Sequence, residues 1–254
     1  MYKHKFNKQS IDVRDIKFKL EYTQLISLHL PSILKLNDNI KLPVLSQGDL
    51  GSCTANAISN AILYDLKKNK KMPYQPSRLY IYYFSRFLED NVDDDSGCNL
   101  RDAMKAIVKF GACDELLYPY KIQKFNKMPN KICIKQGKQR IKKIKYMSVC
   151  QNLNTIKNCL FNNYPIILGI ELYDSSESDE SLKSGNIQIP NVSNETYIGG
   201  HCILLMGYND EKKIFYFLNS WGADAGENGY FYIPYSYILD SKLAMDFWII
   251  QSVN

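Results

Sequence analysis

The chain has 254 residues, of which 45% are hydrophobic and 23% charged, and its formal net charge is +6. This composition indicates a globular protein with a sizeable core and excludes disordered, collagen-like and repeat proteins. The longest apolar runs span about seven residues, far fewer than the roughly 20 that cross a bilayer, so we expect no membrane partner.

The positive charge is concentrated in one stretch. Residues 121–146 carry nine Lys and one Arg with no Asp or Glu, and the rest of the chain is net acidic. Such a stretch is either a footprint for an anionic partner or a solvated surface segment. No aromatic stacking pattern or nucleic-acid motif accompanies the lysines, so the solvated segment is favoured and nucleic acid is not an expected partner.

Cysteine usage and the N-terminus indicate a reducing compartment. The seven cysteines are too few for a disulfide scaffold and odd in number, so we expect reduced thiols. No apolar stretch of signal-peptide length follows the first lysines. The expected location is the cytoplasm or another reducing intracellular compartment, with packaging in a virion as an alternative.

The first half of the chain predicts mainly helices. Alternation over residues 16–22 places Ile, Phe, Leu and Tyr on one face and predicts a half-buried strand. After the turn at Gly48–Ser52, apolar residues recur at helical spacing from Cys53 to the lysines at 67–71. Two further helices are predicted over residues 76–88 and 100–109.

The second half of the chain predicts mostly strands. Short β-rich runs occupy residues 144–149, 165–172, 201–208, 214–218, 230–233 and 247–250. A helical half followed by a strand half indicates an α+β protein of two lobes with a cleft between them and a boundary near residue 120.

Cys53 is a candidate nucleophile because it lies in the first turn of the predicted helix. Unpaired N–H groups and the helix dipole favour an anion there, so we expect the thiol to ionise easily. The alternative is a small apolar residue packed under a turn. A basic partner must come from His4, His29 or His201, and His4 lies in a tail that we expect to fray.

His201 and Asn219 lie on a predicted hairpin. With pairing centred on Asp210, the two residues face each other directly, and a shift by two residues keeps both side chains on one face. The alternative is a lone strand-edge histidine beside a turn asparagine. The context of Cys53 favours contact between the imidazole and the amide.

These residues stand in blocks that resemble the papain family of cysteine peptidases, in its disulfide-poor branch of bacteria, archaea and large DNA viruses. The blocks are Gln47-Gly-Asp-Leu-Gly-Ser-Cys53-Thr-Ala-Asn-Ala, Gly199-Gly200-His201, Asn219-Ser-Trp221-Gly and Gly226-Glu-Asn-Gly229-Tyr230. They occur in the family's order, and the resemblance extends from about Leu30 to the C-terminus. It implies a papain-like α+β fold with a helical lobe and a β-barrel-like lobe flanking the active-site cleft.

The resemblance also implies roles for single residues. Cys53 would be the nucleophile, His201 its acid/base partner and Asn219 the acceptor that orients the imidazole. Gln47 would complete an oxyanion hole with the backbone N–H of Cys53, although an exposed turn residue is its other interpretation. Trp221 would shield the His–Asn contact and wall the leaving-group side of the cleft, and Gly200 would also contact substrate. No cofactor and no metal are implied.

The chain departs from the family at several positions. Leu50 stands where most members have a cysteine, and Thr54 where most have an aromatic residue. Gly97-Cys98 replaces the Gly-Gly strip that binds substrate backbone, which puts substrate positioning in doubt. A residue between positions 243 and 248 should form the bottom of the main specificity pocket, but the sequence does not define which one.

The sequence therefore predicts three segments and one leading function. Residues 1–29 form an N-terminal extension, 30–120 a helical lobe carrying Cys53, and 121–254 a β-rich lobe carrying His201 and Asn219. The extension either restrains the enzyme from across or beside the cleft or forms an edge strand of the second lobe, which the pattern favours.

The leading function is peptide-bond hydrolysis through a thiolate–imidazolium pair and a thioester. The partners we expect are protein or peptide substrates, and we expect a monomer. The alternatives are a catalytically silent papain-fold binding protein and an acyltransferase that uses the same triad.

Overall fold

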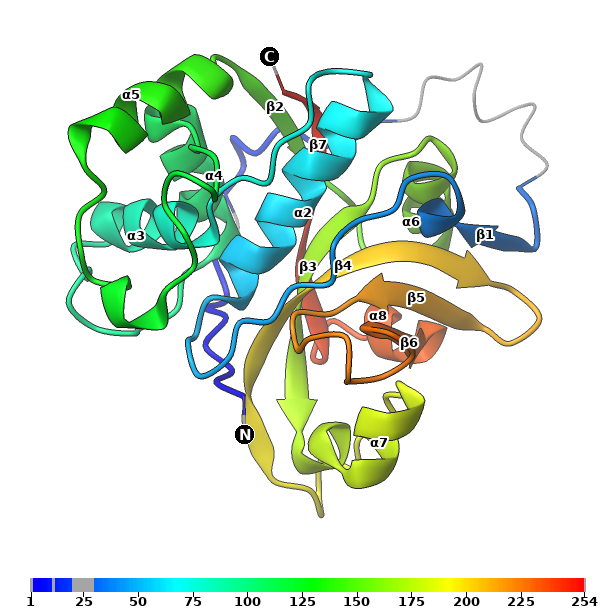
Figure 1. Ribbon diagram of the computed structural model, residues 1–254. Coiled ribbons are helices and arrows are strands. Elements are labelled where there is room, and N and C mark those ends of the chain that lie inside the picture. The colour runs from blue at the N-terminus through cyan, green and yellow to red at the C-terminus, as the bar shows by residue number, and fades with distance from the viewer. Residues whose placement is uncertain (1, 11, 20–29, 254) are drawn as a thin grey trace.

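Helices occupy one side of the molecule and strands the other, with one long helix between them (Figure 1). The computed structural model describes residues 2–10, 12–19 and 30–253. The α+β class predicted from the sequence is confirmed. Within these residues, no helix is both long and apolar enough to span a bilayer.

The long central helix is α2 (Cys53–Lys68). All of its residues from Cys53 to Leu66 are buried, because it contacts β3, β4 and β7 on one side and α3 and α4 on the other. It ends at Lys67 and Lys68, whose positive charges suit a helix C-terminus. Both sides of the molecule therefore fix the position of its first residue, Cys53.

Three helices pack on the far side of α2. These are α3 (Arg78–Leu88), α4 (Leu100–Phe110) and α5 (Lys131–Arg140). The first two were predicted within two residues of their ends. α5 was missed; it follows the predicted boundary at residue 120 but packs against α4.

The strands of the described residues form one antiparallel sheet in the order β2-β7-β3-β4-β5-β6, with β1 paired to β4. The bounds are β1 (Ile33–Lys35), β2 (Ile144–Ser148), β3 (Ile166–Tyr173), β4 (Tyr197–Asn209), β5 (Ile214–Leu218), β6 (Tyr230–Pro234) and β7 (Ala244–Val253). β2 and β6 do not pair with each other, so the sheet is open. The strand-rich lobe expected to be barrel-like is thus an open sheet and not a closed barrel.

Short helices interrupt the strand-rich half, which is less purely β than predicted. They are α6 (Leu153–Phe161), α7 (Asp179–Ser184) and α8 (Tyr235–Leu239), with 3-10 turns η1 (Leu36–Asp38), η2 (Ile122–Lys124) and η3 (Asp174–Glu177). Asn152 caps the start of α6: its side chain accepts the Thr155 N–H at 2.9 Å and so satisfies one unpaired donor of the helix end.

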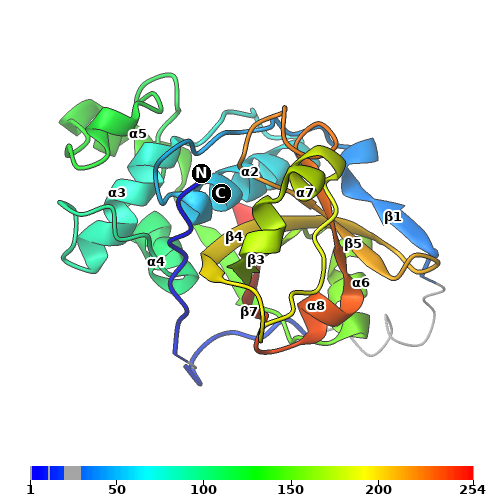
Figure 2. The ribbon, with the colours of Figure 1, turned by 90° about the horizontal axis from the view of Figure 1, so that it is seen from below.

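Residues 2–7, here called the N-terminal segment, pass between the sheet and the helices (Figure 2). The Phe6 N–H donates to the Gly200 carbonyl on β4 at 2.8 Å, and the Asn7 N–H donates to the Cys98 carbonyl before α4 at 3.3 Å. The segment thus bridges both sides of the molecule at the place where the sequence predicts a cleft.

Residues 16–19 are the described part of the strand predicted over 16–22; the rest lies outside the described residues. Here the chain forms a single bridge, Lys17 with Ser148 at the end of β2, and no regular strand. Ile16 is exposed, whereas the Phe18 ring packs edge-on against Tyr164. The prediction of a half-buried strand is therefore not met in this part, although contact with a sheet edge is present.

Candidate active site

Cys53 is the first residue of α2, as predicted. Its N-cap residue, Ser52, makes no side-chain capping bond, so the helix end keeps backbone N–H groups available for another acceptor. Cys53 is fully buried, and all seven cysteines are free thiols. The expectation of reduced cysteines agrees with this arrangement.

His201 and Asn219 meet as predicted, although the hairpin register differs. His201 Nε2 lies 2.8 Å from Asn219 Oδ1, and because an amide oxygen only accepts, the ring nitrogen is the donor. Beside the turn the ladder pairs Asn209 with Ile214, three positions from pairing centred on Asp210, and a bulge between Leu205 and Gly207 reduces the shift to two. A two-residue shift leaves both side chains on the same face, so the contact survives the wrong register.

Trp221 covers this pair. Its ring centroid lies 5.1 Å from that of His201, and the indole is almost completely buried. It excludes water from one side of the His201–Asn219 hydrogen bond, which strengthens that bond in the low-dielectric surroundings.

Gln47 is buried and held in one orientation. Its Oε1 accepts the Ser220 hydroxyl at 2.7 Å, and its Nε2 donates to the Leu50 carbonyl at 2.9 Å. The same Nε2 donates to the backbone carbonyl of Lys3 at 3.0 Å. Gln47 is therefore no exposed turn residue; its amide already binds a peptide carbonyl of the N-terminal segment.

Two adjacent residues of the segment touch the predicted nucleophile and its partner. The Lys5 N–H approaches the Cys53 sulfur, and the His4 ring meets the His201 ring edge-on with centroids 5.4 Å apart. Within the described residues, His201 Nδ1 has no hydrogen-bond partner. Cys53 and His201 thus flank the same two residues of a bound peptide.

The pair is not charged while the segment covers it. Burial raises the pKa of the Cys53 thiol, against the effect of backbone N–H groups that include that of Lys5. Burial, with a smaller contribution from His4, lowers the pKa of His201 to about 3, against the effect of Asn219. The easily ionised thiol expected from the helix end is therefore absent in this form, because covering the site removes water from both charges.

His4 itself is a correction to the sequence prediction. It does not fray: its side chain is 2% exposed and its Nε2 lies 2.7 Å from Glu177 Oε1 in η3. Next to it, the Tyr2 ring stacks on Trp221 with centroids 5.0 Å apart, and its hydroxyl donates to the Trp221 carbonyl at 2.8 Å. These contacts join residues far apart in sequence, so no local pattern could have predicted them.

Phe6 fills a space above the sheet. A Cβ atom on Gly169 of β3 would lie 2.0 Å from the Phe6 ring, so glycine is needed there for the ring to approach. Gly97 plays the same part opposite, because its φ is +74° and a Cβ there would overlap the Lys5 carbonyl. Cys98 still binds a peptide backbone through its carbonyl, despite replacing a glycine of the family pattern.

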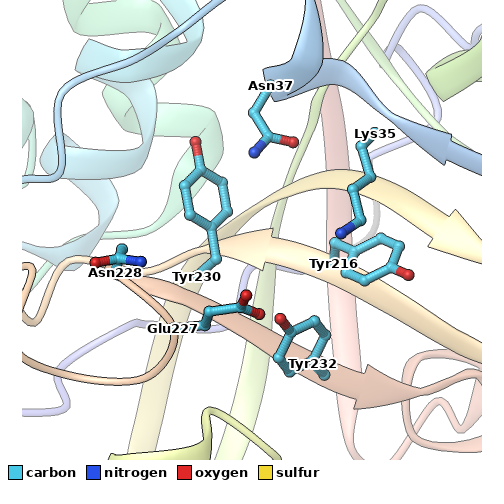
Figure 3. Close-up of a pocket in the computed structure, with 7 residues that line it drawn as sticks. All are labelled: Lys35, Asn37, Tyr216, Glu227, Asn228, Tyr230 and Tyr232. Carbon is cyan, nitrogen blue, oxygen red and sulfur yellow. The ribbon is translucent and has the colours of Figure 1, made fainter.

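A separate cavity of about 200 Å³ lies beside β1, β5 and β6 and contains none of the predicted site residues. Figure 3 shows the Lys35 amine near the Tyr216 ring, and its Nζ lies 4.5 Å from the ring centroid. The lining residues are Lys35, Asn37, Tyr216, Glu227, Asn228, Tyr230 and Tyr232.

Comparison with known proteins identifies the family. The sequence matches the family model of papain family cysteine proteases over residues 35–246. An uncharacterised peptidase C1-like protein of Acanthamoeba polyphaga mimivirus is 40% identical over 221 residues, which cover 84% of this chain and 71% of the relative. The viral cathepsin of Autographa californica nuclear polyhedrosis virus is 31% identical over 145 residues, 54% of this chain and 41% of its own length.

Solved structures give the same result. Xylellain, a cysteine protease from Xylella fastidiosa, superposes with a TM-score of 0.91 at 35% identity, covering 99% of this chain and 96% of its own. A digestive procathepsin L 3 of Tenebrio molitor larval midgut, at 18% identity and a TM-score of 0.70, shares the fold over 93% of this chain and 74% of its own. The chain belongs to the papain family of cysteine peptidases, a family of hydrolases.

Proposed function

We propose that the chain hydrolyses peptide bonds through a thioester formed on Cys53, with His201 as acid/base and Asn219 as the residue that orients it. The observation that most directly supports this proposal is the N-terminal segment bound in the cleft. An extended peptide of this chain lies with one carbonyl on Gln47 Nε2 and one N–H at the Cys53 sulfur. The cleft is thus already shaped to hold a polypeptide against the groups that this chemistry needs.

The reaction follows from these positions. With the cleft open to water, a thiolate at the start of α2 and an imidazolium on β4 stabilise each other, and the thiolate attacks a peptide carbonyl. The Gln47 amide and the Cys53 backbone N–H hold the negative oxygen. His201 then protonates the leaving amine and afterwards activates the water that hydrolyses the thioester. Protein or peptide substrates fit this cleft.

The chain as it stands is a latent form of this enzyme. The N-terminal segment occupies the carbonyl-binding amide, buries the thiol and keeps the imidazole neutral. Of the two interpretations of residues 1–29, restraint from across the cleft is supported by residues 2–7. Attachment to the edge of β2 is supported by residues 16–18, where Ser148 exchanges backbone hydrogen bonds with Ile16 and Phe18.

Labelling and product analysis test the proposed function. In the Phe6→Ala variant, whose cleft should open, a thiol-directed epoxide inhibitor should modify Cys53 and no other cysteine, and the unlabelled variant should release two products from an internally quenched peptide. If an added amine is incorporated in place of water, the chain is an acyltransferase. If Cys53 is labelled but neither product forms, the chain is the silent binding protein.

Closure of the N-terminal segment should weaken in acid through Glu177. Burial raises the pKa of Glu177, but its contacts with His4 and Tyr2 together outweigh burial and hold the pKa below its usual range. The carboxylate therefore stabilises the closed form above the usual glutamate pKa of about 4.3, and this contribution is lost as the pH falls below that value. Opening moves the Cys53 proton to His201 without net proton uptake, so the catalytic pair adds no pH dependence of its own near neutral pH.

The measurement is the epoxide labelling rate divided by that of Phe6→Ala, which cancels the titration of the catalytic pair itself. Asp246, whose pKa burial raises to about 6 and which accepts the Gln9 N–H at 2.9 Å, opposes the acid effect, so both rates are measured in an Asp246→Asn background. We expect the ratio to rise as the pH falls from about 5 to about 4, and to change less when Glu177→Gln is added. A ratio that falls as the solution is acidified would contradict the linkage.

A further inference from the structure

The lysine-rich stretch carries exposed charge that no carboxylate of the described residues pairs. All nine lysines between residues 121 and 145 are exposed, and residues 116–170 contain no Asp or Glu. Within the described part of the chain, none of the nine lysines forms an ion pair with a carboxylate. Their charge is therefore available to a partner.

The nearest carboxylates do not neutralise this surface. Asp114 pairs with Arg140 at 3.7 Å. Glu115 takes both the Nε and Nη2 groups of Arg78, the latter at 2.5 Å. Both acids are thus committed to arginines.

Helix α5 presents part of this charge as a stripe. Lys131, Lys135 and Lys138 follow one another at i, i+4 and i+7 and are exposed, while Cys133 and Gly137 are buried beneath them. A Cβ on Gly137 would lie 2.8 Å from the Tyr80 hydroxyl, so α5 packs closely against α3 on its buried side. α5 lies at the outer end of the helical side, away from the N-terminal segment (Figure 1).

Large apolar side chains stand among these lysines. Met128 and Ile132 are 61% and 67% exposed and lie directly beside Lys127 and Lys131 in the sequence; Leu116 is 90% exposed. The turn that carries Leu116 is held against the same region, because the Tyr118 hydroxyl donates to the Lys127 carbonyl at 2.7 Å. We call this patch the basic–apolar surface; it comprises Leu116, Lys124, Lys127, Met128, Lys131, Ile132 and Lys135.

We propose that the basic–apolar surface docks on an anionic lipid bilayer. The lysines would contact negatively charged headgroups, and the three apolar side chains would enter the interface between headgroups and acyl chains. This is peripheral binding and not a span, and it departs from the expectation of no membrane partner. It concerns a face separate from the cleft and does not depend on the peptidase chemistry.

The composition of the surface favours lipid over nucleic acid. A phosphodiester backbone offers nothing to Met128 and Ile132, and a strand of bases is held by exposed aromatic rings, which are absent from residues 116–146 as the structure describes them. Nine lysines against one arginine supply point charges and few of the bidentate forks that nucleic acids favour.

Vesicle sedimentation of the full chain tests the proposal. At 0.1 M salt the wild type should sediment with vesicles of 30% phosphatidylserine in phosphatidylcholine and remain free of pure phosphatidylcholine vesicles. The triple variant Lys127→Glu, Lys131→Glu, Lys135→Glu should bind at least about 100-fold more weakly, because each lysine near such a membrane contributes about 1 kcal/mol, a factor of about five. The double variant Met128→Ser, Ile132→Ser should bind these vesicles about tenfold more weakly than the wild type, although its charge is unchanged.

A matched charge control is Lys70→Glu, Lys212→Glu, Lys242→Glu, three exposed lysines elsewhere on the molecule. This control should bind within about threefold of the wild type. Equal loss in both triple variants, or no binding by the wild type, would overturn the proposal. The proposal would also be overturned if the wild type bound a DNA duplex but not the phosphatidylserine vesicles, and the double variant Met128→Ser, Ile132→Ser bound that duplex as tightly as the wild type.

Discussion

Replacing Cys53 with alanine is expected to abolish peptide hydrolysis, a loss on the order of 10⁶-fold if the triad acts as one unit. Gln47→Ala should leave measurable turnover, reduced about 10²- to 10³-fold, because it removes one of two donors to the oxyanion. The two losses differ because the thiol forms the covalent bond, whereas the amide only stabilises charge. Initial rates on a fluorogenic peptide, measured in a Phe6→Ala background that opens the cleft, give both values.

The matched control for this comparison is Cys159→Ala, which truncates another fully buried free cysteine outside the cleft. It should retain turnover after correction for any unfolded fraction. Similar residual rates for Cys53→Ala and Gln47→Ala, or full loss in Cys159→Ala, would remove Cys53 from its assigned role.

Phe6→Ala is expected to raise the labelling rate of Cys53 and the rate of peptide cleavage by at least about tenfold. The Phe6 ring is buried against Gly169, and truncating a buried phenylalanine typically costs about 3–5 kcal/mol. Here the loss acts on the equilibrium between covered and open cleft, because the segment packs on the surface of an otherwise complete fold. Second-order rate constants for epoxide labelling give the change directly.

Val13→Ser is the matched control in the same extension, since Val13 is 93% exposed. It should label at the wild-type rate. Deletion of residues 1–29 should match or exceed the gain of Phe6→Ala. If the deletion gives insoluble protein and Phe6→Ala lowers the melting temperature without faster labelling, the extension has a structural role. The interpretation of the chain as a latent enzyme would then be wrong.

The sequence predicted the parts of the site that depend on local structure. Apolar spacing and the turn before Cys53 were sufficient to place the thiol at the start of α2. The His201–Asn219 contact also followed, because the two-residue period of a strand tolerates the register error that occurred. The positions of Gln47 and Trp221 came from the family resemblance and agree with their burial in the structure.

What the sequence did not predict depends on contacts between distant residues. α5 was missed because most of its surface is solvated, and only Cys133 and Gly137 are fully buried on it. The occupants of the cleft were missed because Tyr2, His4 and Phe6 find partners far along the chain, such as Trp221 and Gly169. Whether a sheet closes likewise depends on its two edges meeting, which no single strand encodes.

The bridge between both sides of the molecule made by the N-terminal segment has a kinetic consequence. Because the occupant belongs to the same polypeptide, its local concentration is set by the tether and lies in the millimolar range typical of short connections. Dilution cannot remove such an occupant, and a substrate at micromolar concentration competes with it poorly. Opening is then reversible at every cycle until the tether is cut, so a single proteolytic event would convert a self-limiting enzyme into a permanently active one.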